Sequence, residues 1–261
     1  MKLYKLKKGL INMKNKFHMS LEYNICLAKR NIVDNIYKSA RLEGINVTFP
    51  QVEAIYNGVN ISSLKVDDII TINNLKYAWY VLFDTISYPE VDFAYICKMN
   101  KTIGANLIYQ SGYIRQFDVA IGGTTYKPKM PYKEEIIEEL NEIQKITNTT
   151  QRAITLMLYL MRRQIFIDGN KRTAILCANR ILIENGAGLV NIPVELISEF
   201  KEKLIKYYET NEMKDIMDFT YKNCIDGFNS VEPSIEEKLE SEKNDEMFNQ
   251  YIAKSYKNKL F

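Results

Sequence analysis

Apolar residues recur at helical spacing along most of the chain, and this pattern predicts a protein built from helices. From Ser20, a suitable N-cap, apolar positions repeat every three or four residues to about Ala40. Gly44 can then take the left-handed conformation that ends a helix. The same spacing predicts further helices at about residues 51–56, 67–86, 91–102, 132–146, 193–209 and 214–225.

Two segments, 154–161 and 174–183, are apolar almost throughout and predict helices that are buried on all sides. The residues between them are too polar, and too dependent on Gly169, to continue either helix. The chain must therefore turn and begin a new helix near Asn170.

Residues 108–125 break the helical pattern with dense β-branched and aromatic residues. Gly122 and Gly123 suit a hairpin turn, and Pro128 and Pro131 end the segment. The expected fold is therefore all-α, a multi-helical bundle with one small β-hairpin.

We expect three parts along the chain: a Lys-rich lead-in at residues 1–19 that is frayed or weakly helical, a helical domain at 20–230, and a charged tail at 231–261 that forms an exposed helix. The apolar runs are too short to span a bilayer, and no secretory signal follows the Lys-rich start. These features predict a cytoplasmic protein that does not bind membranes.

The composition adds two limits. With 261 residues, 46% of them hydrophobic, the chain can bury a substantial core, and its net charge of +3 is too small to indicate a nucleic-acid partner. The four cysteines are widely spaced in apolar surroundings, which favours buried free thiols over a zinc or redox site. They are Cys26, Cys97, Cys177 and Cys224.

Candidate chemistry is concentrated between the two apolar segments. Gly169 permits close backbone approach and Asn170 offers amide donors, while Lys171 and Arg172 place positive charge at a helix start, where the helix dipole opposes it. An anionic ligand would explain that placement, and Mg²⁺ between the ligand and Asp168 would remove their repulsion. We predict a nucleotide bound with magnesium. The alternative is an ordinary helix start with solvated cations.

These residues resemble the signature of the Fic family: His-Pro-Phe, any residue, Asp or Glu, Gly-Asn, Gly or Lys, and Arg, often with a second Arg three positions later. The matching positions are Phe166, Asp168, Gly169, Asn170, Lys171 and Arg172. Three positions differ. Gln164 replaces the catalytic His, Ile165 replaces the Pro, and Ile175 replaces the second Arg.

Most Fic proteins transfer AMP from ATP to a hydroxyl side chain of a protein target, so the resemblance implies ATP as substrate and Mg²⁺ as cofactor. It implies a metal ligand at Asp168 and the catalytic position at Gln164. The implied nucleotide contacts are Phe166, Gly169, Asn170, Lys171 and Arg172. Members of the family also carry a β-hairpin flap on which the target docks, and Ile121, Gly122, Gly123 and Thr124 resemble it. A plain surface hairpin is the alternative.

A second motif, Ser39-x-x-x-Glu43-Gly44, resembles the inhibitory segment of regulated Fic proteins. In those proteins the Glu pairs with the second signature Arg. Because Ile175 stands there in this chain, Glu43 must turn to Lys171 or Arg172, or the segment has lost its role. A plain helix end with a solvated Glu43 is the alternative.

Gln164 limits the functional prediction, because an amide has no basic site near neutral pH. A general base typically contributes about 10²–10⁴-fold in rate. His18, the only histidine, lies in the predicted lead-in. We favour a slow Fic-type nucleotidyltransferase, with a catalytically silent nucleotide-binding regulator as the second hypothesis. A nucleic-acid-binding or scaffolding protein outside the family ranks third.

Overall fold

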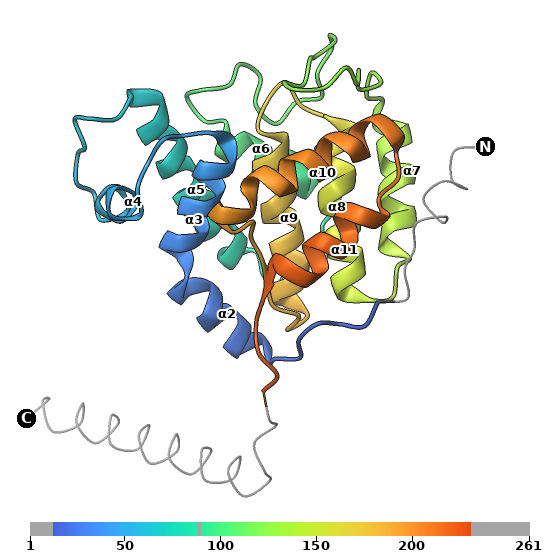
Figure 1. Cartoon of the computed structure of the whole chain (residues 1–261), viewed down its shortest axis with the longest axis horizontal. Helices are drawn as coiled ribbons and strands as arrows, with labels where there is room; N and C mark the ends of the chain where they lie inside the picture. Colours follow the sequence, from blue (N-terminus) through green and yellow to red (C-terminus); the bar gives the residue numbers. More distant parts are fainter. Residues whose placement is uncertain (1–12, 88–89, 231–261) are drawn as a thin grey trace, which may run out of the picture. The chain divides into compact units, whose positions relative to one another are not determined.

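The structure is a computed structural model, and it describes residues 13–87 and 90–230 (Figure 1). The chain divides into two units, Met1–Phe228 and Asn229–Phe261. All helices and strands described below belong to the first unit. Residues 1–12 of the predicted lead-in and the predicted tail helix at 231–261 lie outside the described residues.

The described part of the chain contains ten α-helices, which confirms the all-α fold. They are α2 (Leu21–Arg30), α3 (Ile32–Glu43), α4 (Phe49–Tyr56), α5 (Val66–Asp84), α6 (Phe93–Ile103), α7 (Lys133–Gln144), α8 (Thr149–Arg163), α9 (Asn170–Glu184), α10 (Ile197–Thr210) and α11 (Lys214–Asn223). A short 3₁₀ turn, η1 (Val194–Leu196), follows Pro193 and precedes α10. Within these ranges, no helix is long and apolar enough to cross a membrane.

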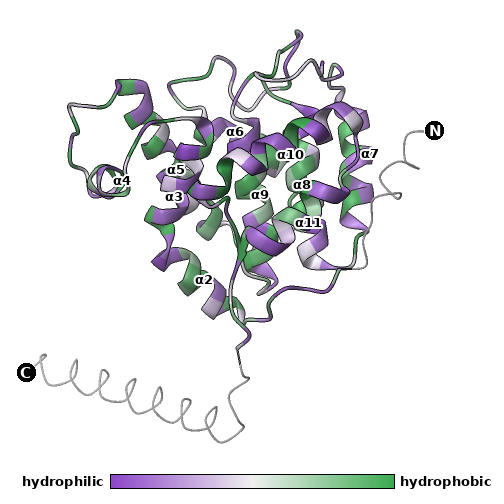
Figure 2. Ribbon diagram, in the orientation of Figure 1, coloured by the Kyte–Doolittle hydropathy of each residue, from purple (hydrophilic) through white to green (hydrophobic). Residues whose placement is uncertain are grey.

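Helices α8 and α9 form the centre of the core, as their apolar sequences predict, and they are buried along nearly their whole length. They pack against each other; α2, α5 and α6 lie against α9, while α7 and α11 lie against α8. The outer helices carry both polar and apolar positions (Figure 2), because each has one face toward this core and one toward solvent.

The helix predicted from Ser20 to Ala40 is two helices. Ser20 caps α2 as expected, by accepting from the backbone N–H of Tyr23, and Gly44 ends α3 in the left-handed conformation with φ 92°. The break falls at Asn31, whose carbonyl begins α3 by accepting from Asn35 N. Apolar spacing continues across the break and therefore did not reveal it.

Residues 13–19 are neither frayed nor helical, contrary to the prediction. The Asn15 side chain accepts from Thr150 N at the start of α8, and Lys16 Nζ donates to the carbonyls of Lys222, in the last turn of α11, and of Ile225, just after it. Met19 N donates to Gly186 O after α9. Helix ends leave backbone groups without hydrogen-bond partners. Residues 13–19 supply partners for several of these groups.

The two-stranded sheet lies elsewhere than predicted. β1 (Leu189–Val190) pairs antiparallel with β2 (Ile225–Asp226), whereas residues 108–125 contain no strand. The carbonyls of Phe117, Pro128 and Lys129 instead accept from the guanidinium of Arg115. Since these groups bond to a side chain, they are not free to form a strand ladder.

The cysteines follow the prediction only in part. Cys177 and Cys224 are buried and Cys97 is half-buried, but Cys26 is exposed, so the expectation of a buried thiol is wrong there. Burial raises the pKa of Cys97 to about 11 and that of Cys224 to about 12, so both thiols stay protonated near neutral pH.

Candidate functional site

The turn between α8 and α9 contains two residues in the left-handed conformation. Gln164 ends α8 with φ 48°, and Gly169 precedes α9 with φ 76°. A Cβ added at Gly169 would lie 3.1 Å from both Asn100 Nδ2 and Ile103 Cδ1. Backbone conformation and close packing therefore both explain the glycine.

Asn170 closes the turn through its side chain. Its Oδ1 accepts from Phe166 N at 3.0 Å, and its Nδ2 donates to Phe166 O at 2.9 Å and to Gln164 Oε1 at 3.0 Å. The other end of the Gln164 amide donates to Met161 O at 2.6 Å. The two amides thus hold the turn in place from inside, and the hydrogen bonds of Asn170 are made within the turn.

The first turn of α9 is rich in donors without acceptors. The first bond of the helix runs from Thr173 N to Gly169 O. The N–H groups of Asn170, Lys171 and Arg172 find no acceptor in the part of the chain that the structure describes. Arg172 Nε is also buried there without a hydrogen-bond partner. These donors and the positive end of the helix dipole favour an anion.

Asp168 lies at the edge of this group with 64% of its side chain exposed. One carboxylate oxygen accepts from Gly169 N at 2.6 Å, and the other lies 3.3 Å from Arg172 Nη2. Among residues 13–87 and 90–230, no three His, Cys, Asp or Glu residues gather in a metal-binding group. The exposed carboxylate fits Mg²⁺ only together with phosphate oxygens and water.

Glu43, the last residue of α3, reaches the same helix start. Its carboxylate lies 3.5 Å from Lys171 Nζ and 3.7 Å from Arg172 Nε, and only 15% of its side chain is exposed. Ile175, at the position of the second signature Arg, is buried. Of the alternatives that the sequence left open for Glu43, the structure shows this residue beside the first-turn cations. Burial is the main cause that raises the pKa of Tyr208, and the nearby Tyr207 and Glu43 raise it further. Tyr208 therefore stays a neutral phenol.

The segment between α6 and α7, green in Figure 1, lies against the turn. Arg115 N donates to Ile165 O at 3.0 Å, and Arg115 Nε donates to Gln164 O at 2.7 Å. Together with the bonds to residues 117, 128 and 129, these contacts make Arg115, which is 2% exposed, the link between this segment and the turn. Burial lowers the pKa of Arg115.

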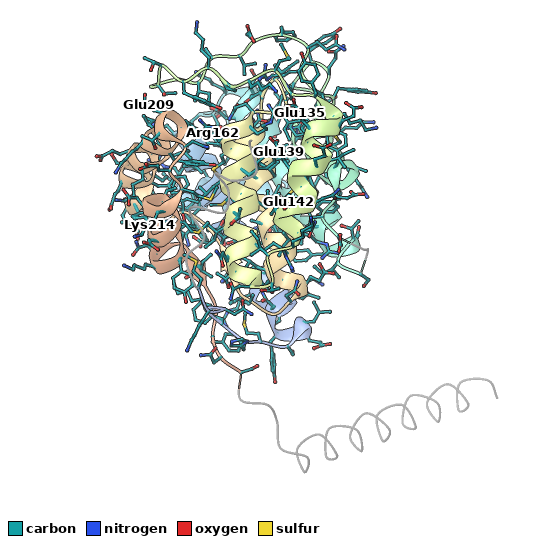
Figure 3. All side chains as sticks on the ribbon, turned by 90° about the vertical axis from the view of Figure 1, so that its right-hand side faces the viewer. Glu135, Glu139, Glu142, Arg162, Glu209 and Lys214 are labelled. Atoms are coloured by element: carbon teal, nitrogen blue, oxygen red, sulfur yellow. The ribbon has the colours of Figure 1, made fainter. Side chains whose placement is uncertain are left out.

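The far part of the segment is held by α8 and α10, seen from the side in Figure 3. Thr124 Oγ1 donates to Glu209 at 2.9 Å, and Tyr126 stacks on Tyr208 with ring centres 6.0 Å apart. The Arg162 guanidinium lies 4.2 Å from the centre of the Tyr126 ring. Of the expected flap residues, Ile121 is half-buried, whereas Gly122 and Gly123 are exposed.

Comparison with known proteins identifies the region around the turn. Residues 90–182 match the model of the Fic/DOC family. This region is a Fic domain. No curated protein matches the chain significantly.

Solved structures of Fic proteins share the fold. Fic-1 (residues 134–508) from C. elegans has a TM-score of 0.66 at 22% identity, over 80% of this chain and 64% of that one. A Fic domain-containing signalling protein from Bacteroides thetaiotaomicron VPI-5482 has a TM-score of 0.65 at 16% identity, over 84% of this chain and 90% of that one. A Fic family protein from Desulfovibrio desulfuricans G20 has a TM-score of 0.62 at 14% identity, over 75% and 62%. The chain thus spans less than two thirds of the C. elegans and D. desulfuricans chains.

The structure brings most of the predicted site residues of the Fic domain together and separates others. Arg172 lies beside both Asp168 and Glu43, and Glu43 also lies beside Lys171. His18 does not join them. The adjacent Met19 bonds to Gly186 beyond the far end of α9, roughly 20 Å along the helix from Asn170.

Sequence reasoning missed Asn100 on α6. This residue is fully buried, and its Nδ2 donates to Asp168 O and Thr173 Oγ1, while its Oδ1 accepts from Gly112 N. An asparagine on the apolar face of a predicted helix was the available signal, because such a polar group must find partners when buried.

Proposed function

We propose that this Fic domain binds ATP with Mg²⁺ at the turn of residues 168–172 and transfers AMP, slowly, to a hydroxyl side chain of a protein target. The observation that carries the proposal is the set of unpartnered donors on the first turn of α9. Three backbone N–H groups and the buried Arg172 Nε share this place with Lys171. A polyphosphate would supply the acceptors that these donors lack.

Asp168 is the proposed metal ligand. Bound there with phosphate oxygens, Mg²⁺ would neutralise part of the charge on the triphosphate. The exposed carboxylate oxygen that now lies 3.3 Å from Arg172 would turn toward the metal, which frees the guanidinium for a phosphate.

In the proposed reaction the target hydroxyl oxygen attacks the α-phosphorus. A new P–O bond forms, the bond between the α-phosphorus and the bridging oxygen breaks, pyrophosphate leaves, and the hydroxyl proton passes to solvent water. Gln164 can orient the hydroxyl but cannot take the proton. The missing base corresponds to about 10²–10⁴-fold in rate, or roughly 3–5 kcal/mol of barrier, which is why we propose slow transfer.

Glu43 is proposed to compete with the nucleotide. Its carboxylate faces Lys171 and Arg172, the same cations that the phosphates need. Both contacts, at 3.5 Å and 3.7 Å, are too long for strong hydrogen bonds, so this inhibition is weak.

A catalytically silent regulator is the second candidate, and one observation favours it. Both ends of the Gln164 amide are bonded inside the protein, to Met161 O and to Asn170 Nδ2. In this arrangement Gln164 braces the turn, and only its second amide N–H and the second lone pair of its oxygen remain for a target hydroxyl.

One pair of measurements tests the proposal. Calorimetry with ATP and Mg²⁺ should show binding, and incubation with labelled nucleotides should place label on the protein itself or on lysate proteins. Absence of binding to any of several nucleotides in the presence of Mg²⁺ would refute the site. Binding without label over long incubation would select the silent regulator.

A further inference from the structure

Residues 118–124, in the segment between α6 and α7, carry backbone groups without hydrogen-bond partners. In the part of the chain that the structure describes, neither the N–H nor the C=O groups of this stretch bond to another group. Backbone with unpaired donors and acceptors is suited to pair with an extended segment of another chain. The direction in which these groups point depends on what holds the stretch in place.

The end of this stretch lies against the last two turns of α10. A Cβ added at Gly123 would lie 3.4 Å from Ile205 Cδ1, and Thr124 Oγ1 donates to Glu209 Oε1 at 2.9 Å. Ile205 and Glu209 are one turn apart and therefore share a face of α10. That face, which also includes Tyr208, supports the stretch from one side.

Arg162, labelled in Figure 3, joins this face of α10 to the end of α8. Its Nε donates to Tyr208 O at 3.1 Å and to Tyr207 O at 3.3 Å. Its guanidinium lies 4.2 Å from the centre of the Tyr126 ring, and that ring stacks on the ring of Tyr208. Arg162, Tyr126 and Tyr208 thus each contact the other two, and a planar guanidinium suits such stacking better than an ammonium group.

Both ends of the stretch are fixed to the turn where the proposed reaction takes place. On one side Arg115 Nε donates to Gln164 O at 2.7 Å. On the other side Tyr126 contacts Arg162, which lies in the last turn of α8, two residues before Gln164. Because the stretch is held at both ends, its open backbone groups keep one position relative to the turn.

We propose that Arg162, Tyr126 and Tyr208 are positioning residues for the target. They hold residues 118–124 so that an extended segment of the target protein pairs with this backbone and its hydroxyl reaches the α-phosphate. The inference rests on the proposed function, because it concerns the second substrate of that reaction. Residues with this role affect the use of a polypeptide acceptor, whereas residues that only stabilise the fold affect ATP binding and every acceptor alike.

The test uses the full chain, as wild type and with Gln164→His, together with labelled ATP, Mg²⁺ and two acceptors. One acceptor is a peptide of alternating valine and glutamine with one central serine, which favours the extended conformation. The other is glycerol, which is too small to need backbone pairing. Tyr126→Ala should raise KM for the peptide about tenfold, as loss of an aromatic contact does, and leave ATP affinity and the rate with glycerol unchanged. Tyr126→Phe keeps the ring and should restore the wild-type KM.

Two further variants sharpen the test. Arg162→Lys keeps the charge but loses the planar group, so it should raise KM for the peptide by a smaller factor. Tyr109→Ala is the matched control, since Tyr109 lies on the same segment with 78% exposure, and it should change nothing.

Three outcomes would overturn the inference: the same KM for the peptide in wild type and Tyr126→Ala, an equal loss with glycerol, or no rescue by Tyr126→Phe. Transfer to glycerol without transfer to the peptide would refute the inference alone. No transfer to either acceptor, in the wild type and in Gln164→His, would refute the proposed function and the inference with it.

Discussion

The two ends of α9 differ in the groups that lie beside their turns. Each adjoins a turn with left-handed residues: Gln164 and Gly169 before the helix, Gly186 and Gly188 after it. At the far end the chain's own backbone fills the space. A Cβ at Gly186 would lie 1.9 Å from Met19 O, and one at Gly188 would lie 2.4 Å from Asp226 O.

At the near end the corresponding groups are left open. A Cβ at Gly169 would meet only side-chain atoms within 3.5 Å. The donors of the first turn of α9 lack acceptors among the described residues. Buried polar groups normally find hydrogen-bond partners inside the protein. At the start of α9 the donors lack such partners, and this lack distinguishes a binding turn from a structural one. The two turns therefore differ in the groups that approach each glycine, whereas the glycines themselves are alike.

The strongest test of this comparison is a matched pair of substitutions. Gly186→Ala should destabilise the protein by about 3 kcal/mol, because left-handed strain adds to a clash with backbone. Gly169→Ala should cost about 1–2 kcal/mol, mainly from strain at φ 76°, since the neighbouring side chains can shift. Thermal unfolding measures both losses.

Nucleotide affinity should show the reverse order. At a temperature where both variants are folded, Gly169→Ala should weaken ATP binding and Gly186→Ala should leave it near the wild-type value. Equal losses of affinity would show that the two turns do not differ in the way proposed.

The next largest effect concerns Gln164. Histidine tolerates the left-handed conformation better than most residues, so Gln164→His should fold and restore a base in the position of the family's His. Transfer of AMP to the protein itself should rise by up to about 10²–10⁴-fold. Gln164→Asn is the control, as it keeps an amide without adding a base. A His variant that binds ATP normally and transfers nothing would favour the silent regulator.

Substitutions at Arg172 and Asp168 separate the effect of charge on ATP binding from the effect of the metal at the start of α9. Arg172→Ala should weaken ATP binding about 10- to 100-fold, the range expected for lost hydrogen bonds to a charged group. Asp168→Ala should chiefly remove the dependence of binding on Mg²⁺. Calorimetry with and without Mg²⁺ measures both, and Lys145→Ala, an exposed residue on the end of α7, controls for net charge. Unchanged affinity in Arg172→Ala would contradict the site.

The same contrast shows what the sequence could reveal. Apolar runs predicted α8 and α9, and Gly169 with Asn170 located the restart, because these features depend on local composition. The break at Asn31 and the contacts of residues 13–19 depend on which helix ends lie nearby in space. The irregular course of residues 108–125 depends on the Arg115 side chain, which no β-propensity describes.

Within the site, residue types were predictable and their partners were not. The Lys171 and Arg172 cations signalled an anion, yet the sequence left open whether Glu43 reached them. The side chain of Asn170 braces the turn, because its partners Phe166 and Gln164 are set by the backbone of the turn, while its backbone N–H stays among the open donors. Pairings of this kind follow from tertiary packing, which spacing alone does not encode.

The smallest expected effect on ATP affinity concerns Glu43, which lies beside the cations at the start of α9. Glu43→Gln keeps the size of the side chain and removes the charge that faces Lys171 and Arg172. We expect about threefold tighter ATP binding and a slightly lower thermal stability, because the ion pairs are long and worth about 1 kcal/mol or less. Glu53→Gln, on the exposed face of α4, should change neither. A gain far above tenfold would make Glu43 a strong inhibitor despite Ile175, and unchanged affinity would show that the phosphates do not compete with it for these cations.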